Sequence, residues 1–113
     1  MRLLLKHQAI EKTHSNECSV IEHPLNHEML DMAIAHISGR YPLERQAVNL
    51  ECAELAYVID GNGKIVINNI EHQLNTGDVV VIDPGEKFYW EGKMKLFLSC
   101  RPAWNKEQHQ LID

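Results

Sequence analysis

Residues 54–63 read ELAYVIDGNG, and residues 77–85 read GDVVVIDPG. Each stretch joins a run of apolar, often β-branched residues to a cluster of Gly, Asp, Asn or Pro. Runs of this kind bounded by turn residues predict β-strands. We therefore expect a strand over 54–59, a hairpin turn over 60–63 and a partner strand over 64–67. A further buried strand is expected over 79–82, before a Pro-Gly turn.

The remaining segments extend the same pattern in both directions. Short apolar runs between turn residues predict further strands over 18–23, 29–38, 70–74, 88–90 and 94–100. Asn105 followed by Gln108 resembles a helix-capping box, so a short C-terminal helical turn is expected. So many short antiparallel strands must close into a barrel or pair as two sheets. The sequence therefore predicts an all-β fold, a small antiparallel β-barrel or jelly roll, in a single domain over residues 1–113.

The charge balance argues against nucleic acid as a partner. Acidic residues outnumber basic ones 16 to 11, the net charge is -5, and no basic cluster occurs. Affinity for phosphates normally comes from clustered Lys and Arg. No apolar run approaches the roughly 18 residues that a membrane span needs, so no membrane partner is expected. Cys18, Cys52 and Cys100 are odd in number and widely spaced, which predicts reduced thiols and, without a secretion signal, a cytoplasmic protein.

In its two decisive stretches the chain resembles the cupin superfamily. A first cupin motif ends with Glu, six residues and Gly, as Glu54 and Gly61 do here. A second motif begins with Gly-Asp, continues through an apolar strand and ends in a Pro-Gly turn, as residues 77–85 do. The resemblance covers residues 30–101 and implies a small cupin-type barrel. It also implies a homodimer, often formed through N-terminal strands such as residues 3–10 here.

The resemblance further implies where a metal would be held. Cupin enzymes typically use a His-x-His pair, the Glu of the first motif and a later His, and these positions fall on Ala47, Asn49, Glu54 and Phe88. Only Glu54 keeps a usual ligand, because Ala and Phe have no lone pair and a neutral Asn oxygen binds zinc, iron or nickel weakly. We therefore expect no metal cofactor at these positions.

Two further groups of residues leave alternatives open. A rearranged metal site using Cys52, Cys100 and His36 with Glu54 is conceivable, since all are suitable zinc ligands. Arg40 and Arg45 would suit an anionic ligand at the rim, or they pair with nearby acidic residues. The other histidines lie mostly near turns or ends, so we expect them to be exposed: His7, His14, His23, His27, His72 and His109.

The inward positions predict a ligand site. In a cupin-type barrel Asn49 and Glu54 point inward beside Phe88, and strand alternation places Trp90 on the same face as Phe88. A buried carboxyl has a raised pKa, so Glu54 can exchange a proton or bind a ligand hydroxyl. Aromatic rings beside it suit a small amphipathic ligand. The predicted ligand-binding residues are Asn49, Glu54, Tyr57, Phe88 and Trp90.

We therefore expect a barrel that binds a small polar or sugar-like ligand in its cavity. Two alternatives stay open: an isomerase or epimerase in which Glu54 is the acid/base, and an inert barrel used for protein–protein interaction. The same residues also permit structural roles, with Glu54 bonded to Asn49 and with Phe88 and Trp90 filling the core. A roomy cavity would favour binding, and a second titratable group near Glu54 would favour the enzyme.

Overall fold

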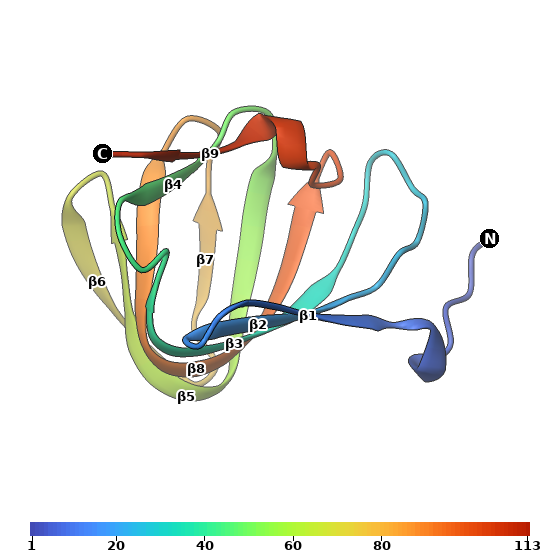
Figure 1. The fold of residues 1–113 in the computed structure, drawn as a ribbon, viewed down its shortest axis with the longest axis horizontal. Coiled ribbons are helices and arrows are strands. Elements are labelled where there is room, and N and C mark those ends of the chain that lie inside the picture. The colour runs from blue at the N-terminus through green and yellow to red at the C-terminus, as the bar shows by residue number, and fades with distance from the viewer.

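The computed structural model describes residues 1–113, and nearly all of its regular structure is β (Figure 1). Nine strands form one sheet that curls into a half-barrel. They are β1 (Ile10–Ser15), β2 (Cys18–Glu22), β3 (Ala33–Tyr41), β4 (Gln46–Asn49), β5 (Ala53–Ile67), β6 (Ile70–Asn75), β7 (Val79–Ile82), β8 (Lys87–Arg101) and β9 (His109–Ile112). The helical elements are two 3-10 turns, η1 (Lys6–Gln8) and η2 (Lys106–Gln108). The predicted all-β class is confirmed.

Two long strands organise the sheet. β8 pairs antiparallel with β3, β4 and β5, and β5 pairs in turn with β6 and β7. Each of the two contains 15 residues and curves through the bottom of the half-barrel in Figure 1. Both strands therefore contribute to opposite walls, and the concave side between the walls holds the candidate site.

These long strands correct the predicted hairpin over 60–63. β5 continues through those residues, and β8 continues through Gly92, where the pattern indicated a strand break. Gly63 pairs with Gly92, and Gly92 pairs with Gly39 of β3, so the glycines form a row across three strands. Glycine marks either a turn or a bend at a barrel corner. Here it marks the bend, and the two uses look the same in the sequence.

The glycine row lets three backbones approach closely. Gly92 has a φ of +136°, and a Cβ at this position would lie 2.5 Å from the Cα of Gly63. A Cβ at Gly63 would lie 2.5 Å from the carbonyl oxygen of Glu91. Any side chain at either position would push the strands apart. Glycine therefore permits the curvature that creates the concave face.

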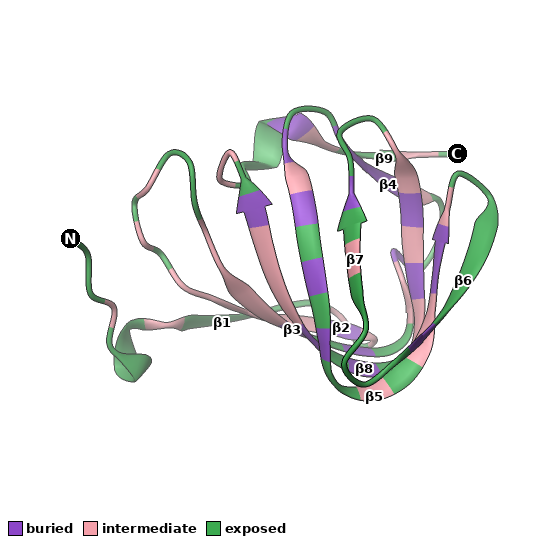
Figure 2. Cartoon of the chain, turned by 180° about the vertical axis from the view of Figure 1, so that it is seen from behind, coloured by how far each residue is buried: buried purple, intermediate pink, exposed green.

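Side chains alternate between the inside and the outside of the half-barrel. Along β5, residues 54, 56 and 58 are buried and residues 55, 57 and 59 are exposed, as the banding of that strand in Figure 2 shows. The inward side chains form one hydrophobic core: Cys18, Ala35, Ile37, Ala47, Ala56, Val58, Ile65, Leu74, Ile82, Phe88, Trp90, Met94 and Leu96. The predicted period of two is confirmed in this strand.

The loop between β2 and β3 is longer than predicted. The pattern begins a strand at Met29, whereas β3 begins at Ala33. Asp31 accounts for the difference because its Oδ1 accepts from the backbone N–H of Cys100 (2.6 Å) and its Oδ2 from that of Trp104 (2.9 Å). These bonds tie the loop to the end of β8 in place of strand pairing. Residues of this loop consequently line the concave side.

The chain ends differ from the prediction in two ways. The helical turn is confirmed, since the Asn105 side chain accepts from the backbone N–H of Gln108 at 3.1 Å. The pattern does not predict β9, which pairs with β4 and places His109 opposite Asn49. The strand expected over 3–10 begins only at Ile10 and forms the edge of the sheet, after η1.

No helix of the protein has the length and apolar character needed to cross a membrane.

Candidate functional site

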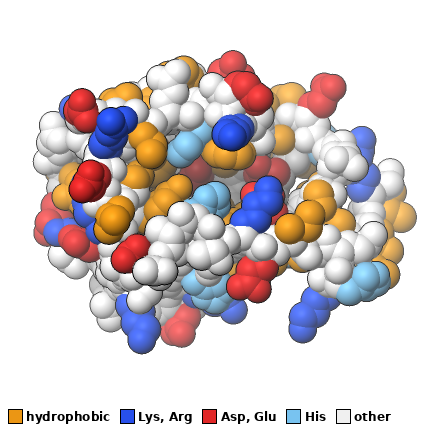
Figure 3. Space-filling view, viewed as in Figure 1, with side chains coloured by type: hydrophobic (Ala, Val, Ile, Leu, Met, Phe, Trp, Pro, Cys, Tyr) orange, Lys and Arg blue, Asp and Glu red, His pale blue; other side chains and the backbone are white.

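The concave face encloses a cavity of about 550 Å³. Sixteen of the 28 residues that line it are hydrophobic, so a polar group on its wall is poorly solvated. Histidine and acidic side chains gather near the hollow in the middle of the face shown in Figure 3. The titratable residues of the lining, other than cysteine and tyrosine, are Lys12, His14, Glu22, His23, His27, Glu28, Asp31, Glu54 and His109.

Glu54 is the most buried of these acidic groups, with 7% of its surface exposed. Its Oε1 accepts from Asn49 Nδ2 (3.3 Å) and from the thiol of Cys100 (3.7 Å). Cys100 is in place to donate because it lies directly opposite Glu54 in the β5–β8 pairing. Oε2 has no partner within the protein, and no Lys or Arg lies at ion-pair distance. The carboxyl therefore presents one free oxygen to the cavity.

The surroundings of Glu54 alter its acidity. Burial raises the pKa of its carboxyl from 4.5 to about 7, and the charge of Asp31 acts in the same direction. The hydrogen bonds from Asn49 and Cys100 oppose this shift. Cys100 stays a thiol because its hydrogen bond with Cys52, and then burial, raise its own pKa. Near neutral pH the Glu54 carboxyl can consequently donate or accept a proton.

A buried polar network continues behind Glu54. Asn49 is fully buried, and its Oδ1 accepts from Gln108 Nε2 (3.0 Å) and lies 2.8 Å from Nδ1 of His109. The Oε1 of Gln108 accepts from the backbone N–H groups of residues 51 and 52, at 3.1 and 3.3 Å. β4 supplies Asn49 and β9 supplies His109, which are direct partners in the sheet. Glu54 and His109, two titratable residues that line the cavity, are therefore connected through the side-chain amide of Asn49.

Aromatic side chains form part of the wall. Phe88 and Trp90 are buried on the inner face and meet edge to face, with ring centroids 6.4 Å apart. Trp104 lies on the other side against His109, at 5.3 Å between centroids. The rings line the cavity without filling it. This geometry argues against a filled, inert barrel.

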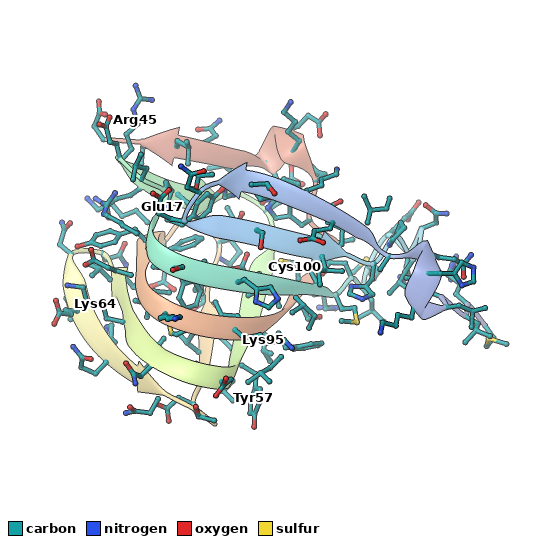
Figure 4. The ribbon with its side chains drawn as sticks, turned by 60° about the horizontal axis from the view of Figure 1, so that its bottom comes forward. Glu17, Arg45, Tyr57, Lys64, Lys95 and Cys100 are labelled. Carbon is teal, nitrogen blue, oxygen red and sulfur yellow. The ribbon has the colours of Figure 1, made fainter.

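Only three of the five predicted ligand residues line the cavity in the structure. Glu54, Phe88 and Trp90 line the cavity. Tyr57 does not: it is 40% exposed and projects outward from β5 (Figure 4), because an odd offset from Glu54 places it on the opposite face of the strand. Its predicted position around the cavity is wrong. Asn49 lies within the wall and reaches the cavity only through its hydrogen-bond partners.

The histidines of the cavity are the main residues that the sequence does not reveal. His14, His23, His27 and His109 line it, and the last three are half-buried rather than exposed as predicted. The Nδ1 of His23 is buried without a hydrogen-bond partner. No local pattern points to these residues, because long-range strand pairing brings them together.

The residues present do not fit the metal centre that the cupin resemblance implies. Ala47 and Phe88 offer no ligating atom, and the side-chain oxygen of Asn49 already accepts hydrogen bonds from Gln108 and His109. Nowhere in the chain do three or more His, Cys, Asp or Glu side chains lie where they could hold one metal ion. The rearranged site is not assembled either, since His36 is exposed between the buried Ala35 and Ile37 and so faces away from Cys52, Cys100 and Glu54.

The two arginines proposed for the rim do not reach the cavity. Arg40 donates to the carbonyl oxygens of residues 42, 43 and 45 and lies 3.8 Å from the ring centre of Tyr89. Arg45 is exposed and pairs with Asp113 at 3.4 Å; Figure 4 shows it at the edge of the molecule. An anionic ligand would therefore meet no arginine in the cavity.

Comparison with solved structures gives the class of the fold, which is cupin-like. Pac13 from Streptomyces, a nucleoside dehydratase, superposes with a TM-score of 0.89 at 12% identity over 99% of this chain and 91% of its own. An RmlC-like cupin from Shewanella frigidimarina gives 0.74 at 13% identity over 91% and 92% of the two chains. KdgF from Halomonas gives 0.73 at 12% identity over 92% and 96%.

These similarities establish the architecture that residues 54–63 and 77–85 indicate. Identities of 12% and 13% show the fold alone. Variants of Pac13 have been solved with uridine. No protein-family model matches the chain, and no curated protein sequence matches it.

Proposed function

We propose that the protein binds a small, neutral, hydroxyl-bearing ring compound, such as a sugar or a nucleoside, with Glu54 as its principal polar contact. The observation that carries this proposal is the free Oε2 of a buried carboxyl on the wall of an open cavity of about 550 Å³. Cavities of this size, mostly apolar with a few convergent polar groups, are typical of small-molecule sites.

The charges of the lining favour a neutral ligand. Lys12 is the only Lys or Arg of the cavity, and it pairs with Glu22 at 3.1 Å. The acidic residues Glu28, Asp31 and Glu54 also line this space. A phosphate or carboxylate would meet these acidic groups without a free cation to compensate. Hydroxyl groups, in contrast, can donate to a carboxylate and accept from a histidine.

The structural neighbours support a small-molecule role. Pac13, which has the same architecture, is a nucleoside dehydratase, and its variants have been solved with uridine. In this chain the rings of Phe88 and Trp90 offer the apolar contact that a base or a sugar face needs. A nucleoside or a sugar of similar size is therefore the first class to test.

A second candidate is acid–base catalysis on the same class of compound, of the isomerase or epimerase type. The raised pKa of Glu54, about 7, favours it because such a carboxyl exchanges protons near neutral pH. We propose that either function operates without a metal, since among the cupin metal positions only Glu54 keeps a usual metal ligand. The homodimer and the cytoplasmic location remain predictions.

A thermal-shift screen tests the binding proposal. The panel contains uridine, cytidine, D-xylose and D-glucose, with uridine monophosphate and glucose phosphate as charged counterparts. At ten times its Kd a ligand stabilises the fold by about 1.4 kcal/mol, so a neutral member is expected to raise Tm by about 5 °C. Glu54→Gln is expected to abolish the rise and stay folded.

Controls make this screen decisive. Glu51→Gln changes an exposed carboxyl outside the cavity and should keep the full rise, and a chelator should leave it unchanged. A full rise in Glu54→Gln would show that the carboxyl is not the recognising group. Stabilisation by the charged members alone would contradict the neutral ligand class, and no response to any neutral member would contradict the proposal itself.

A further inference from the structure

We propose that His109 and Glu54 form a directional proton-transfer pair, in which His109 Nε2 accepts a proton from carbon and Glu54 Oε2 gives one to a carbonyl oxygen. The corresponding substrate class is a neutral hydroxy-aldehyde or hydroxy-ketone. The inference rests on the proposed function, because it needs a neutral small molecule in the cavity. Asn49 and Gln108 act as positioning residues.

The direction of the network follows from two backbone amides. The N–H groups of residues 51 and 52 can only donate, so the atom of Gln108 that meets them is its carbonyl oxygen. Gln108 must then present its NH₂ group to Asn49, whose Oδ1 accepts at 3.0 Å. Asn49 in turn presents its own NH₂ group to Glu54. The orientation of both amides is fixed without any choice of proton position.

The same orientation fixes the state of His109. Asn49 Oδ1 can only accept, so the ring nitrogen 2.8 Å away, Nδ1, carries a hydrogen. In the neutral ring the lone pair is therefore on Nε2, the ring nitrogen that does not contact Asn49, and His109 is one of the residues that line the cavity. Burial, and then the charge of His14 on β1, lower the pKa of His109, which keeps it neutral. The other titratable or charged residues around this space, besides cysteine and tyrosine, are Lys12, Glu22, His23, His27, Glu28, Asp31 and Glu54.

Glu54 is the complementary acid. Its Oε1 already accepts from Asn49 and from the thiol of Cys100, so a proton on the carboxyl sits on Oε2. That oxygen has no partner in the protein, and the residue lines the cavity. A base and an acid thus bound one space, and both are connected to Asn49.

The reaction that this pair suits is enolisation. The C–H bond beside the carbonyl breaks, and its proton bonds to Nε2 of His109. The electron pair of that bond forms a C=C bond, and the carbonyl π pair takes the proton of Glu54 Oε2. The products are a neutral enol, an imidazolium and a carboxylate. When the enol returns to the carbonyl compound with a proton taken from solvent, the hydrogen on that carbon has been exchanged. The step needs no oxidant and no metal.

Nitrogen NMR of ¹⁵N-histidine-labelled protein tests the network first. At neutral pH His109 is expected as the tautomer with hydrogen on Nδ1, although free imidazole side chains favour the other tautomer. Asn49→Leu, if it folds, should return His109 to the Nε2–H form. A wild-type His109 that is protonated on Nε2 alone would overturn the proposal, whatever the variant does.

Hydrogen exchange tests the chemistry, with dihydroxyacetone in D₂O as the probe and proton NMR as the readout. Wild type is expected to exceed the buffer rate by about 10²-fold, and His109→Gln and Glu54→Gln should each lose that gain. His36→Gln, on the outer face, should keep it. Exchange at the buffer rate in wild type, or full exchange in His109→Gln, would overturn the pair. Binding of neutral rings in the thermal-shift screen would survive either result, so the two proposals fail separately.

Discussion

The free energy of unfolding of Glu54→Gln, taken relative to that of wild type, is expected to increase by about 3 kcal/mol as the pH rises from 4.5 to above 7. The folded chain holds the Glu54 proton up to a pKa of about 7, whereas the unfolded chain releases it near 4.5. This group therefore stabilises wild type most below pH 4.5, and its contribution is lost as the pH rises through 7. Glutamine cannot titrate and still offers an oxygen to Asn49. Urea unfolding of both proteins at pH 5 and pH 8 measures the difference.

The comparison between the two proteins removes the other titrating groups from this measurement. The exposed carboxyls that are distant from residue 54 are present in both, so their contributions cancel in the difference. Glu51→Gln, an exposed neighbour, is the matched control and should follow wild type at every pH. If the stability of Glu54→Gln instead follows that of wild type in parallel at every pH, the Glu54 carboxyl is solvated in the folded protein, which would contradict its burial on the cavity wall.

Gly92→Ala is expected to lower the free energy of unfolding by about 3–5 kcal/mol. The new methyl group would lie 2.5 Å from the Cα of Gly63 and 2.9 Å from the carbonyl oxygen of Asn62. The φ of +136° adds backbone strain for any L side chain. A loss of this size is a large share of the stability of an ordinary domain.

Gly77→Ala separates close approach from backbone strain. Gly77 also has a positive φ, +94°, but nothing lies within 4 Å of a Cβ at that position. It should lose only about 1–2 kcal/mol, the cost of the strained conformation alone. Chemical denaturation of both variants measures the contrast. Equal losses would mean that the close contact between β5 and β8 does not govern the bend.

The fold is largely readable from local sequence, and the errors have a common cause. The runs at 54–59 and 79–82 lie in strands, as predicted, and the turn residues around 83–85 also behave as expected. Gly61, Gly63 and Gly92 were ambiguous because one residue type serves both tight turns and close strand crossings. Only the pairing of Gly63 with Gly92, far apart in the sequence, shows which use applies.

The site was predictable only in part, for a related reason. The inward positions of Glu54 and Phe88 follow from the cupin resemblance, and that of Trp90 follows from strand alternation with Phe88. The same alternation places Tyr57 outside, so that error was avoidable. His109 was not predictable, because β9 joins the site by pairing with β4, and nothing near His109 marks that contact. Asp31 was hidden in the same way, since its partners lie at the far end of the chain.

Methyl-resolved NMR during titration with the neutral panel tests the central claim most directly. Shift changes are expected at Ile37, Leu96 and Leu98, which line the cavity, and these changes should be lost in Glu54→Gln. The exposed methyl groups of Val79 and Val81 should stay unchanged. Changes confined to those outer methyl groups, or no change with any neutral member, would contradict a ligand site in the half-barrel.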